Sequence, residues 1–111
     1  MKLHSLLYAI LTVGGMTCGQ VLFKRASAQG GIIDILSAPI FWSGVVLYGF
    51  VTCTWVMLLR EIDLTRAYPI MALTYVFVPG ASVALLGEKV GTYYMVGVVL
   101  IVGGILVTVL E

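Results

Sequence analysis

Charge is what this chain has least of. Only 10% of its 111 residues are Asp, Glu, Lys or Arg, whereas soluble domains carry roughly 25%. Hydrophobic residues make up 61% of the chain, and the mean hydropathy is +1.14. The composition excludes an ordinary soluble domain and predicts a membrane protein.

Several chemical signatures are also missing. The two cysteines, Cys18 and Cys53, fall inside apolar runs at unrelated positions, so they predict packing residues and no metal site. There is no Ser/His/Asp set and no glycine-rich phosphate loop, and the net charge of +1 comes without a basic run. We therefore expect no enzyme, no cofactor, no metal and no nucleic-acid partner.

The few charges are clustered, and the clusters separate four nearly uncharged stretches. Each stretch is long enough to cross about 30 Å of hydrocarbon, and its apolar content is continuous, which disfavours a barrel of alternating strands. The sequence thus predicts one all-α membrane domain over residues 1–111, with short connections between its spans. The four expected transmembrane helices cover residues 3–23, 38–59, 66–87 and 90–110.

The charges near the helix ends leave the orientation open. If the N-terminus is inside, three basic residues lie inside (Lys2, Arg60 and Arg66) and three outside (Lys24, Arg25 and Lys89), so the positive-inside rule does not decide. Four short helices enclose little space, and alternating access normally needs two related repeats. Because the chain holds no internal repeat, we expect a homodimer or heterodimer, parallel or inverted.

The first helix has one polar face. Steps of three or four residues place Gly14, Thr17, Gln20, Lys24 and Ser27 on it. Gln20 and Lys24, one turn apart, are candidate ligand groups, although Gln20 could instead bond a neighbouring helix. In the alternative, Lys24 and Arg25 only end the helix and snorkel to the headgroups, a role that suits Arg25 in particular.

The third helix is the most irregular. Pro69, Pro79 and Gly80 loosen its backbone ladder, and such breaks are common at transporter hinges. Tyr68 and Tyr75 share a face near Arg66 and are either packing residues or ligand contacts. The fourth helix carries a packing face of small and apolar residues, within the bundle or between subunits. That face comprises Gly97, Leu100, Ile101 and Gly104.

No Asp, Glu or His lies near the middle of any expected span. A proton-coupled exporter of organic cations needs an embedded carboxylate, and none precedes Lys24 in the first helix, where Gly15 and its neighbours are uncharged. Basic groups near the membrane boundary instead suit an anion, phosphate best.

Four segments give the chain a family resemblance. "CGQVLFKRAS", "DLTRAYPIMALTYVFVP", "LLGEKV" and "GVVLIVGGI" together resemble the drug/metabolite transporter superfamily in its short, four-helix form. The last segment is similar to the fourth-helix dimer motif of small multidrug resistance proteins. The "GQ" followed four residues later by lysine is similar to the 4-amino-4-deoxy-arabinose-phosphoundecaprenol flippase subunits, which also lack the exporters' first-helix glutamate.

The resemblance implies a dimeric transporter of the bacterial inner membrane that moves a polyprenyl-phosphate-linked sugar, or a related anionic lipid, between leaflets. Lys24 and Arg25 would catch the phosphate, Gln20 would donate to the headgroup, and Arg66 would approach from the third helix. Two alternatives stay open: an exporter of organic cations or metabolites that uses Glu88 or Asp63 of a partner subunit, and a non-transporting subunit of a larger membrane complex. The expected substrate-binding residues are Gln20, Lys24, Arg25, Arg66, Tyr68, Tyr75 and Glu88.

Overall fold

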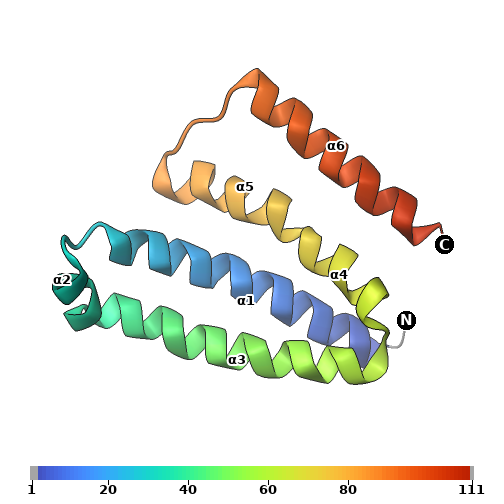
Figure 1. Cartoon of the computed structure of the whole chain (residues 1–111), viewed down its shortest axis with the longest axis horizontal. Coiled ribbons are helices and arrows are strands. Elements are labelled where there is room, and N and C mark those ends of the chain that lie inside the picture. Colours follow the sequence, from blue (N-terminus) through green and yellow to red (C-terminus); the bar gives the residue numbers. More distant parts are fainter. Residues whose placement is uncertain (1–2, 111) are drawn as a thin grey trace.

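The computed structural model describes residues 3–110, which form helices and their connections and contain no strand. Four helical stretches are long and apolar enough to cross a membrane, as predicted: Leu3–Ser27, Pro39–Glu61, Leu64–Leu86 and Thr92–Val109. Figure 1 shows them as successive antiparallel rods. The elements are α1 (Leu3–Ser27), α2 (Ile32–Ser37), α3 (Pro39–Glu61), α4 (Leu64–Ala72), α5 (Thr74–Leu86) and α6 (Thr92–Val109).

The helix boundaries lie a few residues from the predicted ones. The first span continues to Ser27, and its last turn contains Lys24 and Arg25. Their positive charges interact favourably with the negative end of the helix dipole. Pro39 begins α3 at a position where its missing N–H costs nothing.

The connection after α1 is not the short link that the sequence suggested. It contains the helix α2, whose start is held by a bond of 3.2 Å from the Gly31 N–H to the Asp34 carboxylate. Ile32, Ile33 and Leu36 are exposed. Six residues are too short for a reliable periodicity signal, which is why the pattern did not reveal this helix.

The closest helix pair is α1 with α3. A Cβ atom added at Gly15 would overlap the Val51 side chain, and one added at Gly19 would overlap the ring of Tyr48. Near the same interface the hydroxyls of Thr12 and Thr54 share a hydrogen bond of 2.9 Å. Small residues spaced four apart let two backbones approach closely. In this chain Gly15 and Gly19 of α1 have that spacing and face α3.

The third span is broken at Leu73, between the two prolines and at neither of them. Pro69 lies inside α4 and Pro79 inside α5, and each removes one hydrogen bond from the ladder. At the break the Leu73 N–H bonds the carbonyl of Ile70, three residues back instead of four. The hinge role of Pro69, Pro79 and Gly80 stays a prediction.

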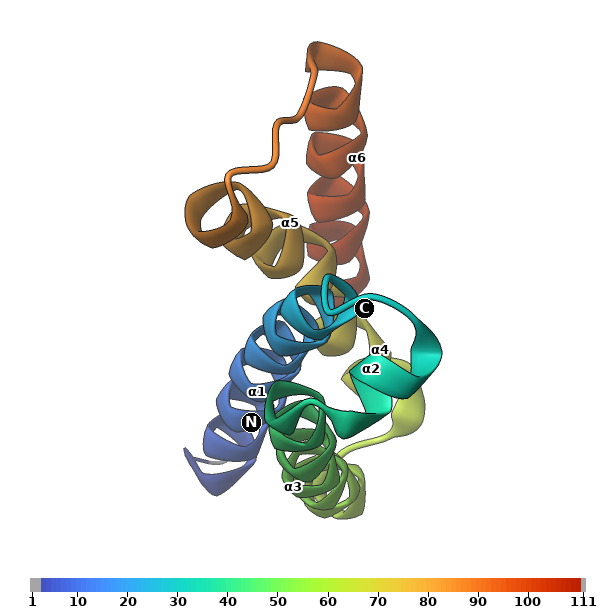
Figure 2. The same ribbon diagram turned by 90° about the vertical axis from the view of Figure 1, so that its left-hand side faces the viewer.

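The last span stands apart from the rest. Figure 2 shows α6 leaning away from the α1–α3 pair, reached by an extended connection from α5. Within residues 3–110, Gly97 and Gly104 have no atom close enough to touch an added Cβ. Cys18 and Cys53 are free and exposed, which corrects the expectation that they pack inside the chain.

The two ends of the bundle carry separate sets of residues. The α1–α2 and α5–α6 connections lie at one end, and the α3–α4 connection lies at the other, beside the start of α1 (Figure 1). Lys24, Arg25 and Lys89 are therefore at the opposite end from Arg60 and Arg66, while Lys2 is outside the described residues.

Candidate functional site

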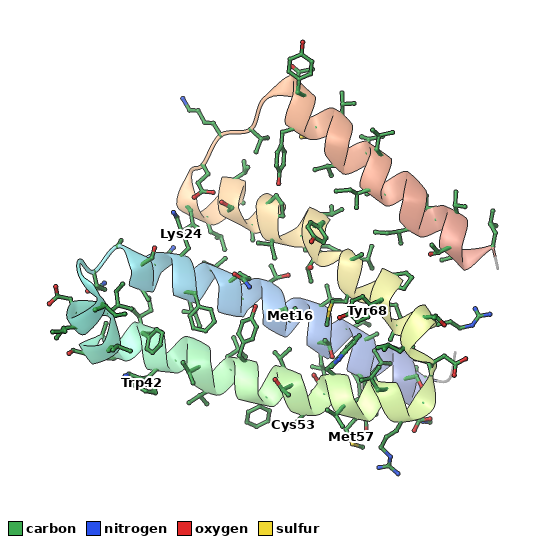
Figure 3. The ribbon with its side chains drawn as sticks, viewed as in Figure 1. Met16, Lys24, Trp42, Cys53, Met57 and Tyr68 are labelled. Atoms are coloured by element: carbon green, nitrogen blue, oxygen red, sulfur yellow. The ribbon has the colours of Figure 1, made fainter. Side chains whose placement is uncertain are left out.

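The candidate site lies where the end of α1 meets the connection between α5 and α6. The Lys24 Nζ is 3.9 Å from the Glu88 Oε2, and Figure 3 shows Lys24 pointing from α1 toward that connection. The side chains are 61% and 47% exposed. Such an open pair contributes about 0–1 kcal/mol to stability, so it can exchange partners readily.

The backbone of α5 explains why Glu88 reaches this position. Gly87 adopts a left-handed conformation (φ 70°) that ends the helix and favours glycine. The N–H groups of Gly87 and Glu88 both bond the carbonyl of Ser82. The reversed chain brings the Glu88 carboxylate back over the last turn of α5, where its Oε1 accepts a hydrogen bond from the Ser82 hydroxyl.

Gln20 lies one turn deeper than Lys24, or about 6 Å along the helix axis. Its Nε2 donates a 2.5 Å hydrogen bond to the Tyr48 hydroxyl on α3. Gln20 thus bonds a neighbouring helix, one of the two roles expected for it. That bond uses a single donor, and an amide side chain has further donor and acceptor positions for a ligand.

Two adjoining hollows are lined by Glu88 and by Gln20, respectively, and Lys24 lines neither of them. The larger, of about 440 Å³, is lined by Val78, Pro79, Ser82, Val83, Glu88, Lys89, Val90, Gly91 and Tyr94. The smaller, of about 230 Å³, is lined by Met16, Gln20, Thr74, Tyr75, Val78 and Pro79. They share Val78 and Pro79, and the larger has the size of a small-molecule site, roughly 300–1,000 Å³. The walls are mostly apolar with a few polar groups, as ligand sites usually are.

The structure brings some predicted residues together and separates others. Gln20 and Tyr75 line one hollow, and Glu88 lines the next and pairs with Lys24. Arg25 is exposed beside Lys24 and has no ion-pair partner among residues 3–110.

Arg66 and Tyr68 lie at the opposite end of the bundle. Arg66 is in the first turn of α4, and the Tyr68 ring packs edge-on against Trp55 with a centroid distance of 6.0 Å. Figure 3 shows Tyr68 far along the bundle from Lys24. Within one chain, Arg66 therefore does not approach a phosphate held by Lys24.

Four residues of the site were not expected from the sequence: Tyr48, Ser82, Lys89 and Tyr94. The one usable signal was Gly87, because a glycine after an apolar run predicts a left-handed helix end that turns the following side chain back. Contacts between α1 and α3, or between α1 and residue 88, have no local signature. Among residues 3–110 no cluster of His, Cys, Asp and Glu could hold a metal ion.

Comparisons of the sequence with known proteins show its family. The model of the EamA-like transporter family matches residues 4–110. The chain is 32% identical over 107 residues to a probable 4-amino-4-deoxy-L-arabinose-phosphoundecaprenol flippase subunit ArnE of Pseudomonas aeruginosa (strain LESB58), covering 91% of both chains. It is 29% identical over 101 residues to the subunit of that name from Escherichia coli O45:K1, covering 89% of this chain and 87% of that one.

No solved structure matches the chain significantly. The family match spans nearly the whole sequence, and the similar proteins are named as probable flippase subunits. The four helices long and apolar enough to cross a membrane are consistent with a multi-pass membrane protein. The chain therefore belongs to the EamA-like transporter family, in a short form with four spans, and is a membrane transporter protein.

Proposed function

We propose that this protein moves a polyprenyl-phosphate-linked sugar, or a closely related anionic lipid, between the leaflets of the bacterial inner membrane. The observation that carries the proposal is the contact of Lys24, at the end of α1, with Glu88 in the wall of the larger hollow, while Gln20, one turn deeper, lines the smaller one. The similar ArnE subunits, whose name specifies a sugar-phosphoundecaprenol flippase, support the same substrate class.

The mechanism follows from the division between headgroup and tail. The polyprenyl tail stays in the bilayer, so the protein shelters only a sugar phosphate. Lys24 neutralises the phosphodiester, with Arg25 nearby, while Gln20 and Tyr75 offer hydrogen bonds to hydroxyl groups one turn deeper. The break at Leu73 between Pro69 and Pro79 lets α5 move against α1.

A dimer completes the proposed transporter. One chain gives α6 little packing, and its face of Gly97, Leu100, Ile101 and Gly104 suits close contact with a second helix. The second subunit is another copy or a second short homologue, and the similar proteins are themselves named subunits.

The test is reconstitution in liposomes with a radiolabelled pentose-phosphopolyprenol. Membrane-impermeant periodate, which cleaves vicinal diols, reports how much headgroup lies outside. We expect the parent chain, alone or with a second short homologue from its genome, to expose inner-leaflet lipid faster than empty liposomes.

Lys24→Ala should lower that rate by about tenfold, since it removes a charge-assisted contact worth about 1.5 kcal/mol. Lys24→Arg should retain most of the rate, and Arg25→Ala serves as the neighbouring control with a smaller loss. Equal rates in the parent and Lys24→Ala would refute the phosphate contact. Uptake of a quaternary ammonium dye without lipid flipping would favour the cation exporter, and absence of both activities would favour the non-transporting subunit.

A further inference from the structure

The carboxylate of Glu88 occupies the position on Lys24 where the proposed substrate phosphate would bind. Lys24 is on α1 and Glu88 is in the α5–α6 connection, so their ion pair of 3.9 Å joins two separate parts of the bundle. An anionic headgroup cannot bind the Lys24 ammonium fully while the Glu88 carboxylate is in contact with it. The two anions compete for one cation.

The contacts of Glu88 allow its carboxylate to leave Lys24 without losing every partner. One carboxylate oxygen faces Lys24, and the other accepts the hydrogen bond from the Ser82 hydroxyl. If a phosphate displaces the first contact, the second remains, and about half of the Glu88 side chain is in any case open to water. A charge that keeps a hydrogen bond and hydration is released at small cost.

The pair also lies at the edge of the larger hollow. Glu88, Lys89 and Ser82 line that hollow, and Lys24 reaches it from α1 through Glu88. When the pair opens, the connection from Gly87 to Gly91 loses its ionic contact with α1. Binding of an anion would thus free one wall of the hollow.

We propose that Glu88 is a displaceable internal competitor, which holds Lys24 between transport cycles and yields it to the phosphate of the incoming lipid. The proposal rests on the function proposed above and assigns Glu88 a role opposite to that of a substrate ligand. The carboxylate weakens binding of the anionic lipid and returns to Lys24 when the lipid leaves.

The decisive measurement is the affinity of the reconstituted protein for radiolabelled pentose-phosphopolyprenol in nanodiscs. Glu88→Gln should bind about two- to fivefold more tightly, the range expected from loss of one exposed charge pair. Ser82→Ala should bind more weakly than the parent, because Glu88 then has only Lys24 as a partner. A purely structural role would make both variants bind more weakly.

Two controls complete the experiment. In a Lys24→Ala background, Glu88→Gln should no longer raise the affinity, because there is nothing left to compete for. Glu61→Gln changes a carboxylate at the far end of the bundle, where the Glu61 Oε2 lies 3.0 Å from the His4 Nε2, and should leave lipid affinity unchanged. Thermal melts in detergent confirm that each variant folds.

The outcomes separate this inference from the proposed function. Lipid binding by the parent with equal or weaker binding by Glu88→Gln overturns the competitor role and leaves the flippase proposal standing. A gain in affinity that persists without Lys24 also overturns it. If the parent binds no anionic lipid, both proposals fail.

Discussion

Gly14 and Gly15 are adjacent residues of α1 with opposite surroundings. The Cβ position of Gly15 is filled by the Val51 side chain on α3, whereas that of Gly14 has no neighbouring atom. The two differ because one residue turns the helix surface by about 100°. Only one of them is needed for the close approach of α1 and α3.

This contrast gives a prediction at the scale of one methyl group. Gly15→Ala should destabilise the protein by about 1–3 kcal/mol, because overpacking forces the helices apart. Gly14→Ala should be neutral or slightly stabilising, since alanine favours a helix more than glycine does. Thermal melts in detergent, followed by circular dichroism at 222 nm, compare the pair; equal melting temperatures would contradict the packing assigned to Gly15.

At the scale of elements, the divided third span is the feature most relevant to movement. Helices α4 and α5 meet at Leu73, and the prolines at 69 and 79 remove one backbone hydrogen bond on each side of the break. Two short rigid pieces with a weak joint can bend, whereas an uninterrupted 23-residue helix would resist bending. Pro79, which lacks one of the ladder hydrogen bonds, also lines both hollows.

Replacement of Pro79 tests whether bending of the third span is needed for lipid flipping. Pro79→Ala restores an N–H group to the ladder, so we expect equal or higher thermal stability together with a severalfold lower rate of lipid flipping. Pro39→Ala is the matched control, because Pro39 begins α3, where no ladder bond is missing. An unchanged flipping rate in Pro79→Ala would remove Pro79 from the hinge.

At the scale of the whole molecule, the chain divides unevenly. Helices α1 and α3 are tightly packed, while α6 has no buried residue within residues 3–110. Lipid can cover its large apolar side chains at no cost, but glycines contribute most when another backbone lies against them. The face that contains Gly97 and Gly104 is therefore where we expect the second subunit.

The prediction compares two neighbouring glycines of α6. Gly104→Leu should weaken dimerisation about tenfold or more by blocking close approach, whereas Gly103→Leu, rotated by about 100°, should have a smaller effect. In a Cys18→Ser, Cys53→Ser background, Gly97→Cys should form an intersubunit cross-link. Light scattering of purified protein and the cross-linking yield measure both effects; identical behaviour of the two leucine variants would exclude this face.

The family was predicted correctly from the sequence, because the motifs that indicate it are local. The segments "CGQVLFKRAS" and "LLGEKV" are short and contiguous, and the family match over residues 4–110 confirms what they indicated. The helix α2 was missed because it spans less than two turns, too few for a period to show. The break at Leu73 precedes Pro79 because that proline disturbs the helix in the turn before it, where it has no N–H to bond the carbonyl of Tyr75.

The sequence by itself determined that this protein has four membrane spans and belongs to its transporter family. Hydrophobic length is a sum over consecutive residues, and every backbone polar group within a span must be satisfied inside the helix, so neither property depends on how the spans meet. Only the tertiary structure decided that Gly15 and Gly19 pack against α3 and that Glu88 pairs with Lys24. It also decided that Arg66, in the first turn of α4, lies at the opposite end of the bundle from Lys24, in the last turn of α1. Those relations join residues distant in the chain, and they follow from which helix faces interlock, which no local pattern specifies.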